Sequence, residues 1–334
     1  MSTPLPNEPI GGSLITGFLG SGKTTLLNRL LRHPGMGDTA VIVNEFGEVG
    51  LDHLLIDTAL DDAVLLKSGC LCCTLRGDLV DTLGSLFDRR QRGEVPAFRR
   101  VLIETTGLAD PTPILHALMA DPGVTRHYRM GHVVTTVDAV NALGQLARHY
   151  ESAKQAAVAD RLVLTKSDLA SPTDIAAVTA QLRALNATAP IFTVVHGAIE
   201  PDALFPTAED ERSVRMPEVE PHDQEHDHPA HDDHRHGISS HCLIHDHPLH
   251  WPRFAHWLEA LASLRGSDLL RVKGIISVEG RSRPVVVHGV QHVLHSPRQL
   301  QDWPDADRRS RIVFITRDIT SAALEQSFRA SVAG

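Results

Sequence analysis

The chain has 334 residues, of which 42% are apolar, and it carries a formal net charge of −9 at pH 7. This length accommodates two domains with apolar cores, while the acidic balance argues against nucleic acid or an anionic membrane as the main partner. The sequence lacks a run of about 18 apolar residues, which argues against a membrane span, and its N-terminus lacks a secretory pattern.

The first part of the chain, from residue 13 to about residue 195, alternates short apolar segments with helical patterns. Apolar strands that alternate with helices predict an α/β fold, a mostly parallel sheet with helices on both faces. The predicted strands are SLITGF, TAVIVN, AVLLKSG, RRVLIE, GHVVTTV, DRLVLT and APIFTVV. The predicted helices cover 23–32, a segment that begins near 78, 111–120, 151–158 and 172–186.

The rest of the chain divides into a polar segment and a second folded pattern. Residues 206–250 are rich in Glu, Asp, His and Pro, a composition that predicts a linker. Beyond it we expect a helix at WPRFAHWLEALASL, a β-hairpin at DLLRVKGIISVEG and RPVVVHGVQHVL, a strand at SRIVFITR and a final helix. We therefore predict three parts: a domain over 1–205, a linker over 206–250 and a smaller α+β domain over 251–334.

The segment GFLGSGKT, residues 17–24, matches the P-loop pattern G-x-x-x-x-G-K-[ST] between a predicted strand and a predicted helix. In this context backbone amides converge on phosphate oxygens at a helix N-terminus. Lys23 can reach the β- and γ-phosphates, and Thr24 offers a hydroxyl to Mg²⁺. The residues expected to bind the phosphates are Gly17, Gly20, Ser21, Gly22, Lys23, Thr24 and Thr25.

Two further segments, VLIETTG and LTKSD, complete the predicted nucleotide site. Glu104 ends a buried strand, where it can hold the water shell of Mg²⁺, and Gly107 can contact the γ-phosphate through its amide. With Lys23, Glu104 is the predicted catalytic residue. Asp168 can accept two hydrogen bonds from guanine that adenine does not offer, which favours GTP over ATP. The usual pattern is Asn-Lys-x-Asp; here Thr165 precedes Lys166, and its hydroxyl offers fewer hydrogen bonds than an amide.

The cysteines are concentrated in GCLCCT, where Cys70, Cys72 and Cys73 occupy three of four consecutive positions. Neighbours this close cannot form a disulfide framework, so we expect a reducing, cytoplasmic location. Thiolates are soft ligands that suit Zn²⁺ and thiophilic Co²⁺. A metal site is the leading interpretation, and a buried inert cluster and a redox pair are the alternatives.

The segments GFLGSGKTTLLNRLL, VNEFGEVGLD, SGCLCCTLRGDL, ETTGLADP and TKSDL, in this order, resemble the CobW family of P-loop GTPases, which act as metallochaperones. The C-terminal segment resembles the CobW C-terminal domain. The resemblance implies that Cys70, Cys72 and Cys73 bind the metal and that Glu45, in the NEFG switch segment, lies near both metal and nucleotide. It also implies GTP and Mg²⁺ as cofactors and a client metalloprotein as partner. Zinc is the leading metal, and cobalt, for cobalamin biosynthesis or nitrile hydratase activation, is the alternative.

Ten of the 21 histidines lie between residues 222 and 250. Alternation of His with Asp favours weak, multivalent binding of Zn²⁺, Co²⁺ or Ni²⁺, and a solubilising linker is the alternative. Two rival functions remain at this point: a passive metal buffer and a P-loop small-molecule kinase. The predicted weak ligands are His222, His226, His228, His231, His234 and His236.

Overall fold

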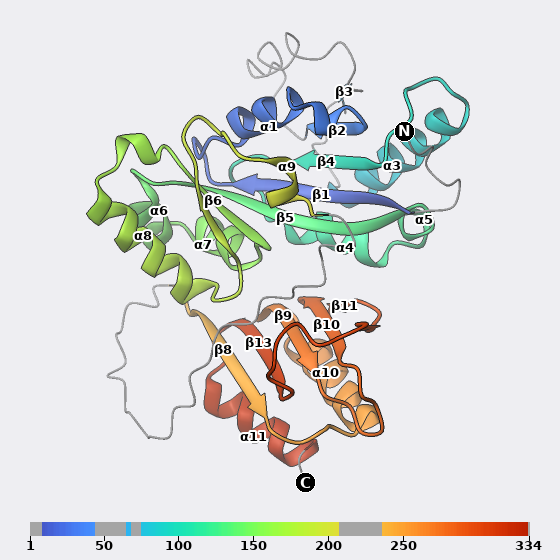
Figure 1. Cartoon of the computed structure of the whole chain (residues 1–334), viewed down its shortest axis with the longest axis vertical. Helices are drawn as coiled ribbons and strands as arrows, with labels where there is room; N and C mark the ends of the chain where they lie inside the picture. Colours follow the sequence, from blue (N-terminus) through green and yellow to red (C-terminus); the bar gives the residue numbers. More distant parts are fainter. Residues whose placement is uncertain (1–8, 44–64, 68–74, 207–235, 333–334) are drawn as a thin grey trace. The chain divides into compact units, whose positions relative to one another are not determined.

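The computed structural model describes residues 9–43, 65–67, 75–206 and 236–332, which fold into two compact units. Each unit is built on its own β-sheet (Figure 1). Within the described ranges, the helices are all too short or too polar to cross a membrane.

The sheet of the first unit has seven strands, and its neighbouring strands run parallel. They are β1 (Ile10–Gly17), β2 (Thr39–Val43), β3 (Leu65–Lys67), β4 (Arg100–Glu104), β5 (Tyr128–Asp138), β6 (Arg161–Thr165) and β7 (Ile191–Thr193). Their order is β3-β2-β4-β1-β5-β6-β7, so β1 lies at the centre with β4 and β5 beside it. Strands β2, β4 and β6 are buried along almost their whole length, because both faces of a parallel sheet are covered.

Helices cover both faces of this sheet (Figure 1). On one face, helix α1 packs Leu26, Leu27 and Leu30 into the cluster that contains Ile15 of β1. The opposite face meets α4, because a Cβ atom at Gly12 of β1 would come within 2.9 Å of Leu118. The helices of the first unit are α1 (Lys23–Leu31), α3 (Leu75–Gln91), α4 (Thr112–Ala120), α5 (Pro122–Thr125) and α9 (Pro201–Leu204), with short 3-10 turns at Pro34–Met36 and Ser167–Leu169. Helices α6 (Ala142–Arg148) and α8 (Pro172–Leu185) belong in part to each unit, and α7 (Tyr150–Ala157) belongs to the second.

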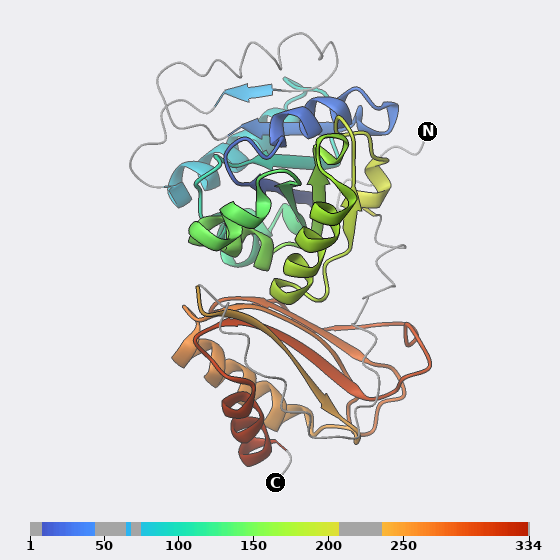
Figure 2. The same cartoon turned by 90° about the vertical axis from the view of Figure 1, so that its left-hand side faces the viewer.

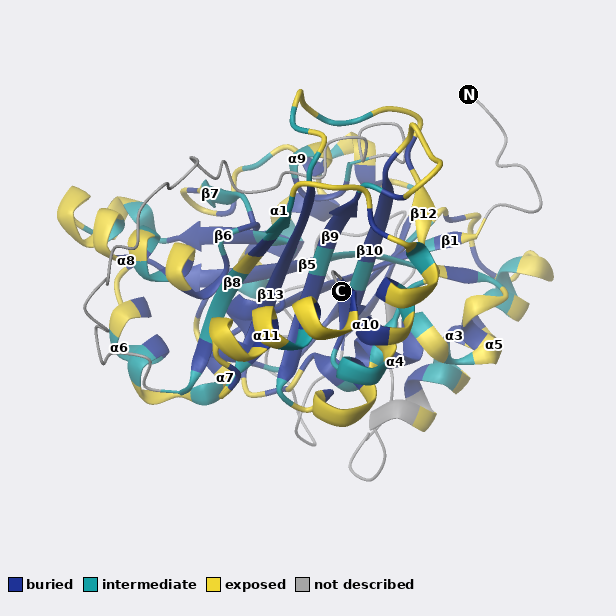
Figure 3. Ribbon diagram, turned by 90° about the horizontal axis from the view of Figure 1, so that it is seen from below, coloured by how far each residue is buried: buried dark blue, intermediate teal, exposed yellow. Residues whose placement is uncertain are grey.

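The second unit has a six-stranded antiparallel sheet with two helices on one side (Figure 2). Its strands are β8 (Ile238–His245), β9 (Leu269–Ile276), β10 (Val285–Val290), β11 (Val293–Leu294), β12 (Arg298–Gln299) and β13 (Ser310–Arg317). Phe254 and Trp257 of α10 (Trp251–Arg265) and Phe328 of α11 (Ser321–Ser331) pack with Phe314 of β13. The outward sides of both helices are exposed (Figure 3).

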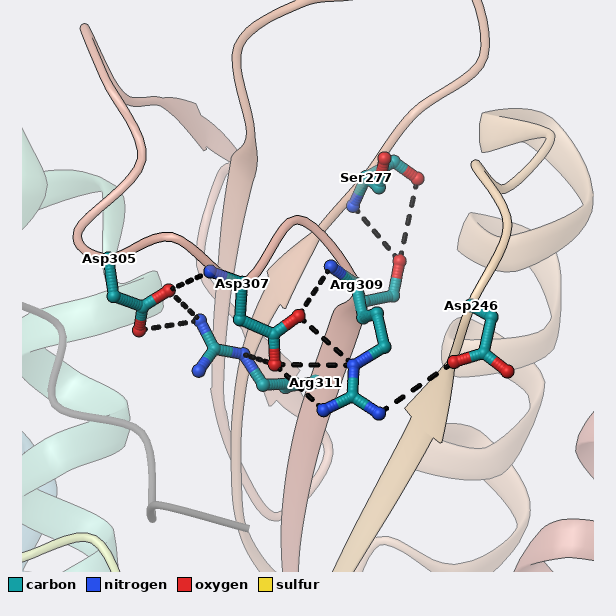
Figure 4. A network of polar contacts seen from close by, with 7 residues as sticks. Asp246, Ser277, Asp305, Asp307, Arg309 and Arg311 are labelled. Atoms are coloured by element: carbon teal, nitrogen blue, oxygen red, sulfur yellow. Dashed lines mark hydrogen bonds and ion pairs between the residues drawn. The ribbon is translucent and has the colours of Figure 1, made fainter. Parts of the chain in front are cut away.

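Arginine–aspartate pairs order the loop before β13, and the pair of Arg311 joins this loop to the strand (Figure 4). Nη2 of Arg311 lies 2.9 Å from both carboxylate oxygens of Asp305. Nε of Arg309 donates to Oδ1 of Asp307 and Nη2 donates to Oδ2, each at 3.0 Å. Two-pronged contacts of this kind fix the direction of both side chains.

The expectation of a linker through residue 250 is wrong at its C-terminal end. Strand β8 lies inside that range and pairs with β13 from Ile238 to His245. The sequence conceals this strand because half of its side chains are serine or histidine and the segment before it is also polar. Ile238 and Leu243 are nevertheless buried, and Leu243 belongs to the core of the second unit.

Candidate nucleotide site

Loops that follow the central strands of the first sheet form the candidate site. The P-loop follows β1, Glu104 ends β4, and Thr165 ends β6. Because β4, β1, β5 and β6 are consecutive in a parallel sheet, their carboxyl ends lie along one edge. This edge is the usual ligand-binding position in open α/β sheets.

The P-loop has the backbone shape that its glycines predict. Gly22 caps α1 in the left-handed conformation, with φ of 89°, which a side chain at this position would disfavour. The hydroxyls of Ser21 and Thr136 lie 2.7 Å apart and fasten the loop to β5. The loop thus presents the N-terminus of α1, the positive end of the helix dipole, as a position suited to an anion.

Lys23 lies over this loop. Its ammonium donates hydrogen bonds to the carbonyl oxygens of Gly17 at 2.9 Å and Phe18 at 3.2 Å. A flexible lysine held at the loop can transfer these hydrogen bonds to phosphate oxygens when a nucleotide binds.

Thr24 and Glu104 supply oxygen ligands of the kind that Mg²⁺ prefers. The hydroxyl of Thr24 donates to Oε1 of Glu104 at 2.9 Å, although the two residues are 80 positions apart. Glu104 is 5% exposed. A buried carboxylate beside a hydroxyl fits a hydrated divalent cation, which the hydroxyl oxygen and the carboxylate could hold directly or through water.

Gly107 packs directly on the P-loop. A Cβ atom there would come within 2.7 Å of the backbone nitrogen of Leu19, so the loop after β4 approaches the P-loop backbone as only glycine allows. This contact brings the backbone of Gly107 next to the place where the terminal phosphate is expected.

The expected guanine loop begins at Thr165, whose hydroxyl lies 2.8 Å from the carbonyl oxygen of Ser21. The threonine therefore ties this loop to the P-loop. Lys166 adopts the left-handed conformation, with φ of 55°. Ser167 donates to the carbonyl of Val194 at 3.0 Å. Val194 directly follows β7, so this bond joins the loop to the end of that strand. Asp168 follows and is exposed.

Sequence reasoning missed Asp138 in this region. It ends β5 as Glu104 ends β4, and its carboxylate forms an ion pair with Lys166 at 2.8 Å. The signal was an acid at the end of an apolar strand, the same one that indicated Glu104. This acid can be linked to the guanine loop only once β5 and β6 are known to be neighbouring strands.

The predicted tight metal site lies outside the described residues. Cys70, Cys72, Cys73 and Glu45 fall in the ranges 44–64 and 68–74. The same is true of five histidines expected as weak ligands: His222, His226, His228, His231 and His234. The sixth, His236, lies within the described part and is half-buried. In the described ranges, His, Cys, Asp and Glu side chains form no cluster of three suited to a metal ion.

Residues 12–193 match the CobW/HypB/UreG nucleotide-binding domain, and residues 238–332 match the cobalamin synthesis protein CobW C-terminal domain. The chain belongs to the CobW family. The recognition of this family from sequence motifs is confirmed, as are nucleotide binding by the first domain and the P-loop type of its sheet.

Two relatives show how far the similarity to CobW proteins extends. The protein named zinc chaperone YjiA, from Escherichia coli K12, is 34% identical over 98% of this chain and 99% of its own length. The protein named zinc chaperone CobW, from Pseudomonas aeruginosa, is 30% identical over 96% of this chain and 91% of its own. The crystal structure titled Zn(II)-bound YjiA GTPase matches 97% of this chain and 99% of its own, with a TM-score of 0.74 at 30% identity. The likeness thus covers both domains.

Proposed function

We propose that this CobW-family protein hydrolyses GTP and uses its nucleotide state to hold and release a transition metal for a client metalloprotein. Zinc is the favoured cargo, because relatives along the whole chain carry the name zinc chaperone. Cobalt remains the alternative cargo. The protein would work in the cytoplasm, where reducing conditions keep its clustered thiols free to bind metal.

The observation that carries the hydrolytic part is the convergence of Lys23, Thr24 and Glu104 at one end of β1. Bound Mg²⁺ would neutralise charge on the phosphates and polarise the bond to be broken. Thr24 and Glu104 would orient that ion, directly or through its water shell. Lys23 would stabilise negative charge that grows in the transition state.

The guanine half of the site would use Asp168. Its carboxylate can accept hydrogen bonds from both N1–H and the exocyclic amine of guanine, and adenine would leave it unpaired. The exposed position of Asp168 on a loop tied to both the P-loop and Val194 supports this role.

The metal half would use Cys70, Cys72 and Cys73, with Glu45 in the segment that precedes them. In the sequence, the Glu45 segment follows β2 and the cysteine segment follows β3. Val43 of β2 pairs with Glu104 of β4, so the Glu45 segment begins close to a Mg²⁺ ligand, and the cysteine segment begins at the strand that pairs with β2. The histidine-rich segment would collect metal weakly and pass it to the thiols.

The experiment that tests this function measures phosphate release from GTP and from ATP with Mg²⁺, in the wild type and in Lys23→Ala. We expect GTP to be the better substrate, and we expect Lys23→Ala to lower turnover by roughly 100-fold or more. Arg29→Ala, an exposed change on the same helix, is the control and should retain turnover. Wild-type turnover in Lys23→Ala would contradict the assignment, and equal use of ATP would favour a kinase-like or other P-loop enzyme.

A further inference from the structure

The carboxylate of Asp138 is engaged on both oxygens by the loops that surround the guanine half of the site. Its Oδ2 accepts hydrogen bonds from Nζ of Lys166 at 2.8 Å and Nδ2 of Asn141 at 3.0 Å. Its Oδ1 accepts from the backbone amides of Val140 at 2.9 Å and Asn141 at 3.3 Å. The residue is 1% exposed. A buried acid with this many donors has a defined geometry.

The charge of this carboxylate is maintained by its donors. Burial by itself would raise the pKa of Asp138, but the hydrogen bonds, with that from Lys166 foremost, outweigh it and hold the pKa below its ordinary value. Asp138 is therefore an anion at neutral pH, and it offers Lys166 a charged partner.

Asp138 also lies directly beside the start of the expected guanine loop. It pairs with Thr165 in the ladder between β5 and β6, and the amide of Ala139 donates to the carbonyl of Thr165 at 3.0 Å. The next residue, Lys166, has φ of 55°, a conformation that residues other than glycine keep only when their surroundings hold them. The ion pair to Asp138 is such a restraint.

The direction of Asp168 depends on this bend. Asp168 is exposed, and within the described ranges its carboxylate has no hydrogen bond that would orient it. Its aim toward a base is therefore set by the backbone between Lys166 and Asp168, which must leave β6 at the correct angle.

We propose that Asp138 is a positioning residue for guanine recognition: by holding the ammonium of Lys166, it fixes the left-handed bend that turns Asp168 toward the base. The proposal rests on the guanine role of Asp168 stated above. It assigns Asp138 to specificity for the base, and it leaves binding of the phosphates to the P-loop.

The test compares the dissociation constants of GTP and ATP for the full chain. Asp138→Asn keeps the size of the side chain and an oxygen for the backbone amides, but it removes the charge that holds Lys166. We expect GTP affinity to fall by roughly tenfold while ATP affinity changes by less than about twofold, so that the preference for guanine shrinks. A purely stabilising role would lower the melting temperature and weaken both nucleotides equally, and that result would overturn the proposal.

Substitutions of Lys166 provide a second test of the ion pair and leave the buried Asp138 unchanged. Lys166→Arg preserves the ion pair and should retain the GTP/ATP ratio, whereas Lys166→Met should reduce it. Because Asp138 acts through Lys166, Asp138→Asn should add little to the loss in Lys166→Met, as a double-mutant cycle will reveal. Additive losses would contradict the mechanism even if one single variant proved unstable.

Asp121→Asn is the matched control. Asp121 also accepts two backbone amides, those of Gly123 and Val124 at 2.9 and 3.3 Å, but it caps α5. Asp121→Asn should lower the stability of the fold without changing the ratio of GTP to ATP affinity. Measurements on the wild type and on Asp168→Asn separate the two claims. If the wild type shows no preference for GTP over ATP, the assignment of Asp168 to guanine recognition fails. If Asp168→Asn erodes the preference and Asp138→Asn does not, only the positioning role of Asp138 fails.

Discussion

The hydroxyl of Thr24 and Oε1 of Glu104 are 2.9 Å apart, which joins the first turn of α1 to the end of β4. Both groups are Mg²⁺ ligands by chemistry, so the pair locates the metal end of the nucleotide site. We expect Thr24→Ser, which keeps the hydroxyl, to retain GTP hydrolysis. Thr24→Val should raise the Mg²⁺ concentration needed for half-maximal turnover by at least roughly tenfold. A Mg²⁺ titration of phosphate release compares the two variants, and an unchanged requirement in Thr24→Val would place the ion elsewhere.

The guanine preference should depend on the carboxylate of Asp168. Asp168→Asn replaces one acceptor oxygen by a donor, which opposes the donors of guanine, and should reduce the ratio of GTP to ATP affinity by roughly tenfold, about 1.4 kcal/mol. Competition binding with the two triphosphates measures the ratio. Ser171→Ala, an exposed change shortly after this loop, should leave it unchanged. A wild-type ratio in Asp168→Asn would show that another group recognises the base.

The P-loop and the end of β4 were predictable from the sequence because each is a local pattern with a mechanism. Lys23 and Thr24 follow a glycine-rich turn, and Glu104 ends an apolar strand. Asp138 was not predictable, because its meaning depends on β5 lying beside β6 and on Lys166 bending back toward it.

The architecture of the second unit was predictable only in part. The α10 helix, the β9–β10 hairpin and β13 follow apolar periodicity and are confirmed. Strand β8 escaped because its histidines and serines resemble the polar segment before it, and its assignment requires the ladder with β13.

Acid should destabilise the second unit through Asp307. The hydrogen bond from Arg309 holds the pKa of Asp307 below its ordinary value of 3.8 in the folded protein (Figure 4). The unfolded chain therefore binds the proton more tightly, so this stabilisation is complete at neutral pH and is lost as the pH falls through about 4 and below the folded pKa. We expect Asp307→Asn to weaken the pH dependence of unfolding in that window.

The fluorescence of tryptophan reports this transition selectively, because Trp251, Trp257 and Trp303 all lie in the second unit. Denaturant unfolding at pH 7 and at about pH 3 gives the comparison. Asp302→Asn, an exposed acid in the same loop, serves as the control. If Asp307→Asn and the wild type lose equal stability on acidification, the pair with Arg309 does not contribute to the acid response.

The histidine-rich segment can be shortened without harming the fold only if β8 is spared. Deletion of residues 222–234 removes five histidines and leaves β8, and we expect it to lower the number of weakly bound Zn²⁺ ions while the tightest site and GTP hydrolysis persist. Deletion of 222–250 would also remove the strand that pairs along β13 and should unfold the second unit. Equilibrium dialysis counts the ions, and loss of the tight site in the shorter deletion would move that site into this segment.

The central claim is that the nucleotide and the cargo metal influence each other, and a pair of titrations tests it most directly. Zn²⁺ affinity is measured with a non-hydrolysable GTP analogue, with GDP and without nucleotide, and affinity for the analogue is measured with and without Zn²⁺. We predict a change of roughly 5- to 150-fold that is equal in both directions, since coupling between two binding sites is reciprocal. Replacement of Cys72 and Cys73 by alanine should abolish tight Zn²⁺ binding and the effect of Zn²⁺ on the analogue together. Superimposable curves within each pair for the wild type would show that the sites are independent and would contradict the account.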